Sequence, residues 1–507
     1  MVLRFPSKVL SFAALFIGVL VLSSSAVSQV GAAPPLRLED ILSALRDSEA
    51  GLPTTNRAVA KQIAERGVNF DIDEGTEAKF RDAGADDILI ASIRESLCGR
   101  YVGEADQCPA GDHACQIENY DKALSFHPDD DKVIFNRGLA RHNAGDYAGA
   151  IKDYTRSLEL LPKDADAYGN RANSYASMGE RELALKDYEQ AIVLAPRDAR
   201  HVLNRGNLHF SARNYDLAIR DLSRCLILAP KDIDCMTSRA DAYIEKRQYA
   251  LAIRDLDRAL SFDPENADAL VSRGRAYRDY GRFNQAFADF DIALKIDPKS
   301  AYALHNRGIA FAEKDEPDKA IADYSASIEI DGRNEEVFVN RALSFVAKKQ
   351  ITSALVDLNK AIQINPKSYL AYVTRGELYT EAKEYEKAIV DLTKAATIED
   401  SFASAYFSRG YVYTEIGDLE NALKDFDKVI SIDLRNSAAF SNRALVHLRS
   451  GDHRKAISDS TRSIQLDPKN AAAYEIRSIA YEAIGDLRRA SADKKRFEAL
   501  SATIGSQ

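Results

Sequence analysis

A strict period of 34 residues runs through most of this chain and limits what the chain can fold into. Arginine recurs at this interval in eleven units, and an aspartate follows each arginine sixteen residues later. The arginines are Arg137, Arg171, Arg205, Arg239, Arg273, Arg307, Arg341, Arg375, Arg409, Arg443 and Arg477. A fixed period of this length indicates stacked units that bury their apolar faces against one another. The period therefore predicts a solenoid.

Each unit is predicted to contain two helices. Between Val202 and Leu228, apolar residues recur at helical spacing in two runs that turn-forming residues separate. Most units end on proline, which cannot continue a helix, and an Asp, Asn or Ser two residues later can cap the next one. Several units place glycine after the first run, where a left-handed residue closes a helix: Gly145, Gly179, Gly281, Gly417, Gly451 and Gly485.

The motif positions within residues 131–504 resemble those of the tetratricopeptide repeat. A large residue opens each unit, a small residue follows the repeated arginine, and an aromatic residue comes three positions later in most units. The main departure is the arginine itself, which stands where the family has leucine. The resemblance implies an all-α fold, an α-solenoid superhelix of eleven helix-turn-helix repeats, preceded here by a small helical domain.

The repeated arginine and aspartate are expected to pair. We predict that each arginine reaches the aspartate of its own unit or of an adjacent one, as Arg205 with Asp221 and Arg307 with Asp323. Breaking a partly buried pair on one side costs several kcal/mol, whereas an exposed pair contributes ~0–1 kcal/mol. A ladder of arginines for anionic ligands is the functional alternative, and the paired aspartates argue against it.

The first residues have the pattern of an export signal. Arg4 and Lys8 precede an apolar stretch from Val9 to Leu22, and small residues follow. This order is typical of a signal peptide over residues 1–28, although Val9 to Val27 is also long enough for an uncleaved membrane anchor. We expect an exported protein of the periplasm or cell envelope, in contact with a membrane only through this segment.

Two segments precede the repeats. Residues 36–97 keep no 34-residue phase and are predicted to form a small domain of four short helices, at about 38–47, 54–66, 73–83 and 85–97. Residues 98–130 are predicted to be a cysteine-containing linker and a capping half-repeat. Within it, Ile117 to Pro128 resembles the second helix of a repeat without a normal partner.

The cysteines favour disulfides over a metal site. Cys98, Cys108 and Cys115 lie close to His113, but their spacing does not follow the usual zinc-finger patterns. In an exported chain a disulfide among these cysteines is the better interpretation. For Cys225 and Cys235, at turns of neighbouring units that pack together in a stack, a disulfide and two buried thiols remain alternatives.

No pattern of an enzyme is recognisable. Nucleophile elbows, phosphate loops and paired catalytic carboxylates do not stand out, and no cofactor is expected. The net charge of −9 and the lack of basic clusters argue against binding of nucleic acid. The sequence therefore predicts a non-enzymatic scaffold whose partner is another protein or an extended peptide.

The family resemblance also implies where a partner would bind. First helices line the concave groove of such repeats, and the residue before the arginine points into it, here Asn136, Asn170, Asn204, Asn306, Asn340 and Asn442. An asparagine amide can pair with a peptide backbone, and the column resembles the asparagine ladder of the O-linked glucosaminyl transferase superhelix. The alternative is that short polar residues suit a solvated helix position. Apolar neighbours expected in the groove are Phe135, Leu203, Phe210, Phe407 and Tyr411.

Three functions are therefore compared. The first is a protein-binding scaffold in the envelope of a bacterium. The second is an enzyme or an accessory subunit with an activity or a metal site in residues 36–130. The third is a structural spacer, in which substitutions in the groove would have no effect.

Overall fold

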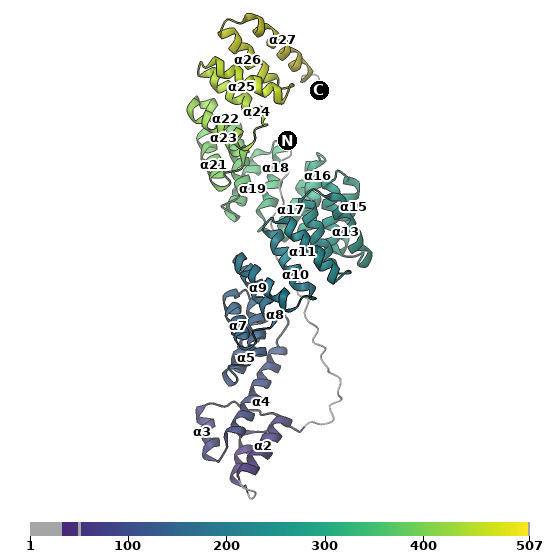
Figure 1. Ribbon diagram of the computed structural model, residues 1–507, viewed down its shortest axis with the longest axis vertical. Helices are drawn as coiled ribbons and strands as arrows, with labels where there is room; N and C mark the ends of the chain where they lie inside the picture. The colour runs from purple at the N-terminus through teal and green to yellow at the C-terminus, as the bar shows by residue number, and fades with distance from the viewer. Residues whose placement is uncertain (1–32, 49–51, 505–507) are drawn as a thin grey trace. The chain divides into compact units, whose positions relative to one another are not determined.

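The chain folds almost entirely into helices (Figure 1). The computed structural model describes residues 33–48 and 52–504, and the predicted export segment, residues 1–28, lies outside the described residues. The only β-type pairing in the described part is an isolated parallel bridge between Leu36 and Val68. No helix among the described residues has the length and apolar character needed to cross a membrane. The predicted all-α fold class is confirmed.

Contacts divide the helices into two compact units. The N-terminal unit ends at Pro264 and the C-terminal unit begins at Glu265. The N-terminal unit holds α1–α13 and the C-terminal unit holds α14–α27. In both units, antiparallel helix pairs follow one another along the chain (Figure 1).

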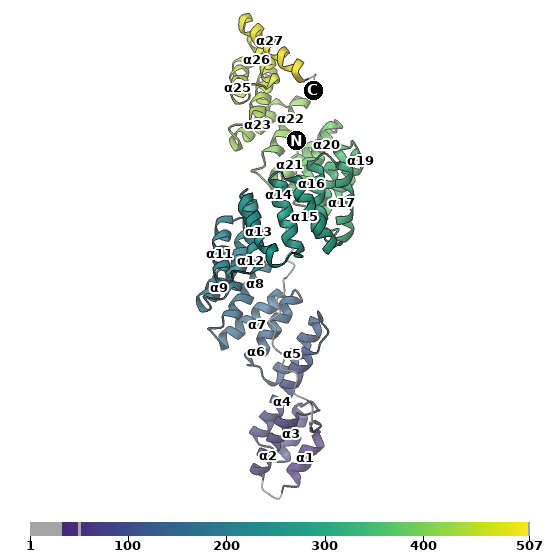
Figure 2. The ribbon, with the colours of Figure 1, turned by 90° about the vertical axis from the view of Figure 1, so that its right-hand side faces the viewer.

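Three shorter helices pack beside a long one at the start of the N-terminal unit (Figure 2). The shorter helices are α1 (Leu38–Arg46), α2 (Leu52–Arg66) and α3 (Glu74–Asp82), and the long one is α4 (Asp87–Asp106). Leu45, Ile63, Phe80, Leu89 and Leu97 belong to their shared apolar core, and each is at most 2 % exposed. Burial of this apolar surface is what stabilises such short helices, because isolated helices of this length are marginal in water.

Helix α4 continues beyond Leu97, where the sequence pattern suggested that the small domain ends. Its second half packs against α5 (His113–Phe126), with Tyr101 and Ala105 in the same buried cluster as Tyr120. The segment around α5 was expected to lack a normal partner, and this expectation is wrong. No proline interrupts α4, so one helix serves both the small core and the first repeat-like pair.

The eleven repeats follow, each a first and a second helix. The first helices are α6 (Asp131–Asn143), α8 (Ala165–Ser177), α10 (Ala199–Ser211), α12 (Ile233–Glu245), α14 (Ala267–Asp279), α16 (Ala301–Glu313), α18 (Glu335–Ala347), α20 (Tyr369–Glu381), α22 (Ala403–Ile416), α24 (Ser437–Arg449) and α26 (Ala471–Ala483). The second helices are α7 (Tyr147–Leu160), α9 (Arg181–Leu194), α11 (Tyr215–Leu228), α13 (Tyr249–Phe262), α15 (Phe283–Ile296), α17 (Pro317–Ile330), α19 (Ile351–Ile364), α21 (Tyr385–Ile398), α23 (Leu419–Ile432), α25 (His453–Leu466) and α27 (Leu487–Ile504).

Local chemistry explains where these helices begin and pack. The side chain of Asp164 accepts hydrogen bonds from backbone N–H groups at the start of α8, as an N-cap does. Small residues allow the two helices of a repeat to touch. A Cβ atom at Gly308 would lie 2.6 Å from Cε1 of Tyr324 on the second helix.

A left-handed residue follows the first helix in every repeat, but it is not always glycine. Arg213, Arg247, Asp315, Lys349 and Lys383 have φ between 58° and 60°, and glycine occupies this position in the other repeats. A left-handed conformation costs a residue with a side chain roughly 1–2 kcal/mol. The stack therefore imposes the turn on sequences that do not favour it.

First helices of neighbouring repeats contact one another within each unit, as α8 with α10 and α24 with α26. No pair of neighbouring second helices makes comparable contact in the described part of the chain. The closer row lies on the concave side of a curved stack. We call the surface formed by the first helices the first-helix face.

Candidate partner-binding face

A buried ion pair joins the two helices of every repeat. The guanidinium of each repeated arginine donates two hydrogen bonds to the aspartate sixteen residues later, at 2.6–3.0 Å. Both Arg205 with Asp221 and Arg307 with Asp323 have this geometry. Of the two partners that the sequence left open, the structure selects the aspartate of the same repeat.

Sequence reasoning missed a second function of these arginines. In nine repeats the remaining Nη1 group donates to a residue sixteen positions earlier, on the second helix of the preceding repeat, at 2.5–3.1 Å. Examples are Thr155 for Arg171 and Asp291 for Arg307. This position holds Asp, Glu, Ser, Thr or Asn in all repeats, a periodic signal that could have revealed it. Each of these nine arginines thus joins three helices.

The surroundings of these arginines favour their charged form. The aspartate carboxylates are buried, and hydrogen bonding to Asp323 holds the pKa of the Arg307 guanidinium above its usual value. Arg443 is shifted in the same direction by its hydrogen bond to Asp459. Bidentate, charge-assisted bonds of this kind are strong and orient both groups. They leave the guanidinium groups engaged within the stack rather than directed at an anionic ligand.

The predicted asparagine column lies on the first helices, but its members differ in their contacts. Asn204 donates to Oδ1 of Asn173 at 3.2 Å, and Asn340 contacts Nε2 of His305 at 2.9 Å. In both cases the partner belongs to the preceding repeat. Asn306 and Asn442 donate to backbone carbonyls of their own helices, those of Tyr302 and Ala438. Asn306 is buried, and its Oδ1 also accepts from Nη1 of Arg278 in the preceding repeat at 3.4 Å. Asn136 and Asn170 are half-buried.

Neighbouring apolar residues are partly enclosed. Phe135, Leu203, Phe210 and Phe407 are half-buried, whereas Tyr411 is exposed. The ring of Phe135 packs edge-on against Tyr154 and that of Phe407 against Phe426, so these side chains support the second helices as well as the surface. Phe135 and Phe407 therefore both pack against a second helix and contribute to the surface, and only part of each ring can contact a partner.

Four of the five cysteines form disulfides. Cys108, in the loop after α4, is joined to Cys115 in the first turn of α5, and Cys225 on α11 is joined to Cys235 on α12. Cys98 is a buried free thiol on α4, and burial raises its pKa. Because Cys108 and Cys115 are bonded to each other, they cannot supply thiolate ligands to a metal ion.

Another group of side chains has spacing suited to a metal ion. Asp166, Asp198 and His201 are the one such group of His, Cys, Asp or Glu residues within 33–48 and 52–504. The sequence analysis did not single them out, and they lie outside residues 36–130. Their ligand atoms all lie within 4.8 Å of one another.

The repeats match sequence profiles of known proteins. Sequence profiles described as tetratricopeptide repeat match residues 132–164, 165–198, 237–301, 272–335, 369–402 and 403–436. No curated protein matches the chain. The profiles cover repeats in both units.

Among solved structures, the chain is similar to a tetratricopeptide repeat protein from Parabacteroides merdae, at 22% identity over 50% of this chain and 98% of the other, with a TM-score of 0.44. It is also similar to yeast Tom70, at 15% identity over 73% and 92% of the two chains and a TM-score of 0.39. A human IFIT1 dimer with m7Gppp-AAAA matches at 16% identity over 73% and 90%, with a TM-score of 0.46.

These TM-scores are low, so the assignment rests on the repeat motifs and the profile matches instead. The motif positions, the paired helices and the first-helix contacts agree with one another across both units. Repeats of this type form protein-interaction scaffolds and are generally not enzymes. The chain belongs to the tetratricopeptide-repeat family.

Proposed function

We propose that this protein is a non-enzymatic scaffold of the cell envelope that binds a partner protein or an extended peptide on its first-helix face. One observation carries the proposal. Six repeats place asparagine at one register of the first helices, while the residues beside it change from repeat to repeat. A constant amide can hold a peptide backbone, and variable neighbours can select its side chains.

The contacts of two asparagines support this role. The amides of Asn204 and Asn340 both reach back toward the preceding repeat, so each lies along the direction in which an extended peptide would cross successive repeats. Their contacts engage the amide nitrogen. A peptide could exchange these contacts for backbone hydrogen bonds at little net cost, because each hydrogen bond lost is replaced.

Charge in the C-terminal unit indicates what a partner would carry. Glu377 and Glu381 lie on α20, and Glu415 lies on α22 beside Phe407 and Tyr411. The exposed carboxylate of Glu377 accepts a hydrogen bond from Ser408 on α22. A partner with apolar anchors and basic residues would complement this part of the face.

The proposed location is supported by two features. Residues 1–28 have the order of an export signal, and four cysteines are paired in disulfides, which persist in oxidising compartments. Thiol labelling of protein taken directly from cells tests the location. For an exported protein we expect two blocked cysteine pairs and one thiol, Cys98, open to alkylation in the unfolded chain. Five open thiols would contradict export.

In-cell photo-crosslinking tests the binding face. A photo-reactive residue is placed at Asn204 in the N-terminal unit or at Asn340 in the C-terminal unit, and crosslinked products are identified by mass spectrometry. Asp318 on α17 is the control, because it is exposed on a second helix. We expect a shared dominant product at the two asparagines and none at the control.

Equal products at all three positions would mean non-specific contact and would refute the proposal. No product at either asparagine, in protein that is folded and exported, would favour the spacer. Activity or metal chemistry in residues 36–130 has lost its main support, because Cys108 and Cys115 are joined to each other.

A further inference from the structure

One position of the repeat carries an unusual residue in the third unit. The residue four positions before the repeated arginine is alanine in seven of the eleven units, but it is His201 on α10. The imidazole is only 4 % exposed. A large polar ring at a position built for a methyl group needs both space and a partner for its nitrogen atoms.

The preceding repeat provides the space. Gly169 on α8 faces the imidazole, and a Cβ atom there would lie 2.6 Å from both Cε1 and Nδ1 of His201. The other units carry a residue with a side chain at this register, such as Leu203 or Val339. Glycine inside a helix is less favourable than alanine. Two departures from the repeat, one on each helix, thus act together to accommodate one ring.

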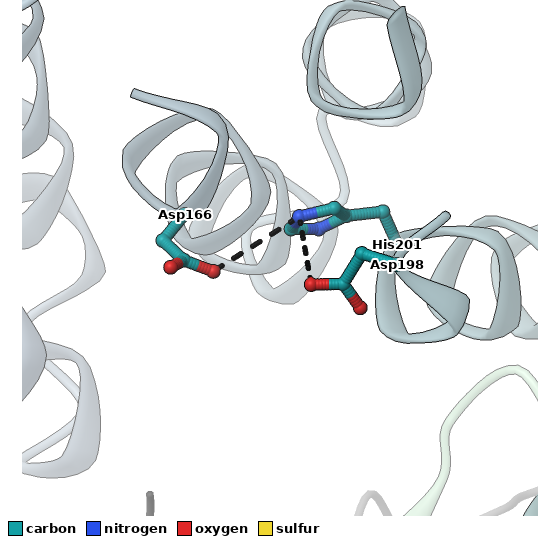
Figure 3. A group of neighbouring side chains, drawn as sticks. All are labelled: Asp166, Asp198 and His201. Atoms are coloured by element: carbon teal, nitrogen blue, oxygen red, sulfur yellow. Dashed lines mark ion pairs between the residues drawn. The ribbon is translucent and has the colours of Figure 1, made fainter. Parts of the chain in front are cut away.

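The ring nitrogen Nε2 of His201 is aimed at two carboxylates (Figure 3). It lies 3.8 Å from Oδ2 of Asp198, the N-cap of α10, and 4.0 Å from Oδ1 of Asp166 in the first turn of α8. Both distances exceed a hydrogen bond, and Nε2 is buried without a hydrogen-bond partner. Leaving such an atom unsatisfied destabilises the folded state.

The two carboxylates already attract a cation. Nη2 of Arg200 lies 2.8 Å from Oδ1 of Asp166 and 2.6 Å from Oδ2 of Asp198. The Arg200 side chain is 56 % exposed, so it can leave without uncovering a core. Its N–H groups donate to the two carboxylates and not to the imidazole, so Nε2 of His201 stays unsatisfied beside them. A metal ion can accept electron pairs from all three residues.

We propose that Asp166, Asp198 and His201 bind a divalent transition-metal ion of the zinc class, which displaces the guanidinium of Arg200. One imidazole nitrogen and two carboxylate oxygens suit zinc better than calcium or magnesium, which prefer all-oxygen sites. Bonds of about 2.0–2.1 Å place tetrahedral ligands roughly 3.3 Å apart. From the present distances of 3.8 and 4.0 Å, the oxygen of Asp198 must therefore approach Nε2 by about 0.5 Å and that of Asp166 by about 0.7 Å. Asp166 is half exposed and can do so.

Such an ion would join α8 to α10, the first helices of successive repeats. Asp166 and His201 lie about one helical turn before Asn170 and Asn204, the residues of the candidate binding face. The metal would therefore set the relative placement of two neighbouring amides. This role is structural, and it does not depend on whether the proposed partner exists.

Titration calorimetry of the purified full-length protein with zinc chloride, after removal of bound metal by a chelator, tests the site. Wild-type protein should bind one zinc ion. His201→Ala should bind zinc with an affinity at least about tenfold lower, because one ligand is lost. Asp166→Asn should weaken binding similarly. Arg200→Ala should tighten it, because the competing cation is gone. The d–d absorption of bound cobalt should change in His201→Ala.

The variants are chosen to fold. His201→Ala restores the residue that most repeats carry, and Asp166 is on the surface. His453→Ala, in the C-terminal unit, is the matched control and should bind zinc as wild type does. Equal zinc affinity of wild type and His201→Ala would overturn the proposal. Binding by Arg200→Ala alone would also overturn it, since Arg200 would then be the resident cation.

Discussion

The two units use the same arginine–aspartate clamp but differ in what else joins their repeats. In the N-terminal unit, a disulfide joins α11 to α12, and the Asp166, Asp198 and His201 group lies between α8 and α10. The C-terminal unit contains no cysteine. There, aromatic rings of neighbouring repeats are in contact, as between Tyr369 and Phe402.

This difference can be traced to one register of the repeat. The position that holds alanine in most units holds His201 in the third unit and Cys235 in the fourth. It lies on the first helix where the preceding repeat packs, so any reactive side chain there faces a neighbour. A repeat scaffold can thus acquire cross-links between repeats by changing a single residue, while the clamp maintains the helix pair.

The largest expected effect tests what the units share. Asp221→Ala and Asp425→Ala each leave a half-buried guanidinium without its carboxylate, because Arg205 and Arg409 donate two hydrogen bonds to these residues. Each should lower the free energy of unfolding by about 3–5 kcal/mol. Urea unfolding, with hydrogen exchange of the affected helices, measures the loss.

Asp318→Ala is the control for this pair of variants. It removes an exposed ion pair with Lys348 and should cost less than about 1 kcal/mol. If Asp221→Ala opens fewer helices than Asp425→Ala, the cross-links of the N-terminal unit confine the damage. Losses as small as that of the control would show that the clamp is not what holds the helix pairs.

The second prediction concerns a cross-link that only the N-terminal unit contains. Replacing Cys225 and Cys235 by serine removes the disulfide that joins α11 to α12, with a sequence separation of 10. Loop-closure entropy for such a loop corresponds to about 2–3 kcal/mol. Hydrogen exchange should become faster in α11 and α12 and stay unchanged in α23 and α24. Faster exchange in both regions would mean that the units do not respond independently.

A third prediction compares two buried histidines by their response to acid. Burial lowers the pKa of His305 to about 3, and Arg278 and Arg275 add to the shift. Burial also lowers the pKa of His201, but Asp198 and Asp166 oppose the shift. A folded-state pKa below the unfolded value means that the unfolded chain takes up the proton first. Stability is therefore complete above about pH 6.5 and is lost as the pH falls below it.

For His305 the slope can reach about 1.4 kcal/mol per pH unit between pH 6.5 and pH 5. Urea unfolding at several pH values should show a shallower slope for His305→Gln than for wild type, and a smaller change for His201→Gln. A slope that neither substitution alters would show that other groups cause the acid sensitivity.

The smallest effect tests a feature that both units share. Arg213 and Lys349 follow the first helices of their repeats and have φ of 60° and 58°. This left-handed conformation favours glycine. Arg213→Gly and Lys349→Gly should each stabilise their repeat by about 1 kcal/mol, measured by urea unfolding. Lys360→Gly, inside α19, is the control and should destabilise by a similar amount. A loss at the two turn positions would contradict the assigned strain.

Much of the fold could be predicted because the same contact between side chains recurs in every repeat. The period located the eleven helix pairs, and the coincidence of the arginine and aspartate periods pointed to side chains that the structure joins. The end of the small domain was harder to locate. Helix α4 belongs to two cores at once, and no residue after Leu97 marks where one core stops.

The candidate binding face was only partly predictable. The asparagine register could be read from the family resemblance, but the partners of Asn204 and Asn340 could not. Asn173 and His305 come from different registers of the preceding repeat, so no common spacing connects them to the column. Such contacts depend on the distance between successive first helices, which the sequence does not state.

The sequence by itself determined the repeat number, the helix pairs and the family, because each rests on spacing along one chain. Only the tertiary structure showed that the arginines reach the preceding repeat and that Gly169 makes room for His201. It also brought Asp166 and Asp198 to one ring nitrogen. The physical reason is that periodic contacts recur at fixed separations, whereas these contacts arise from single departures that become neighbours only after the repeats stack.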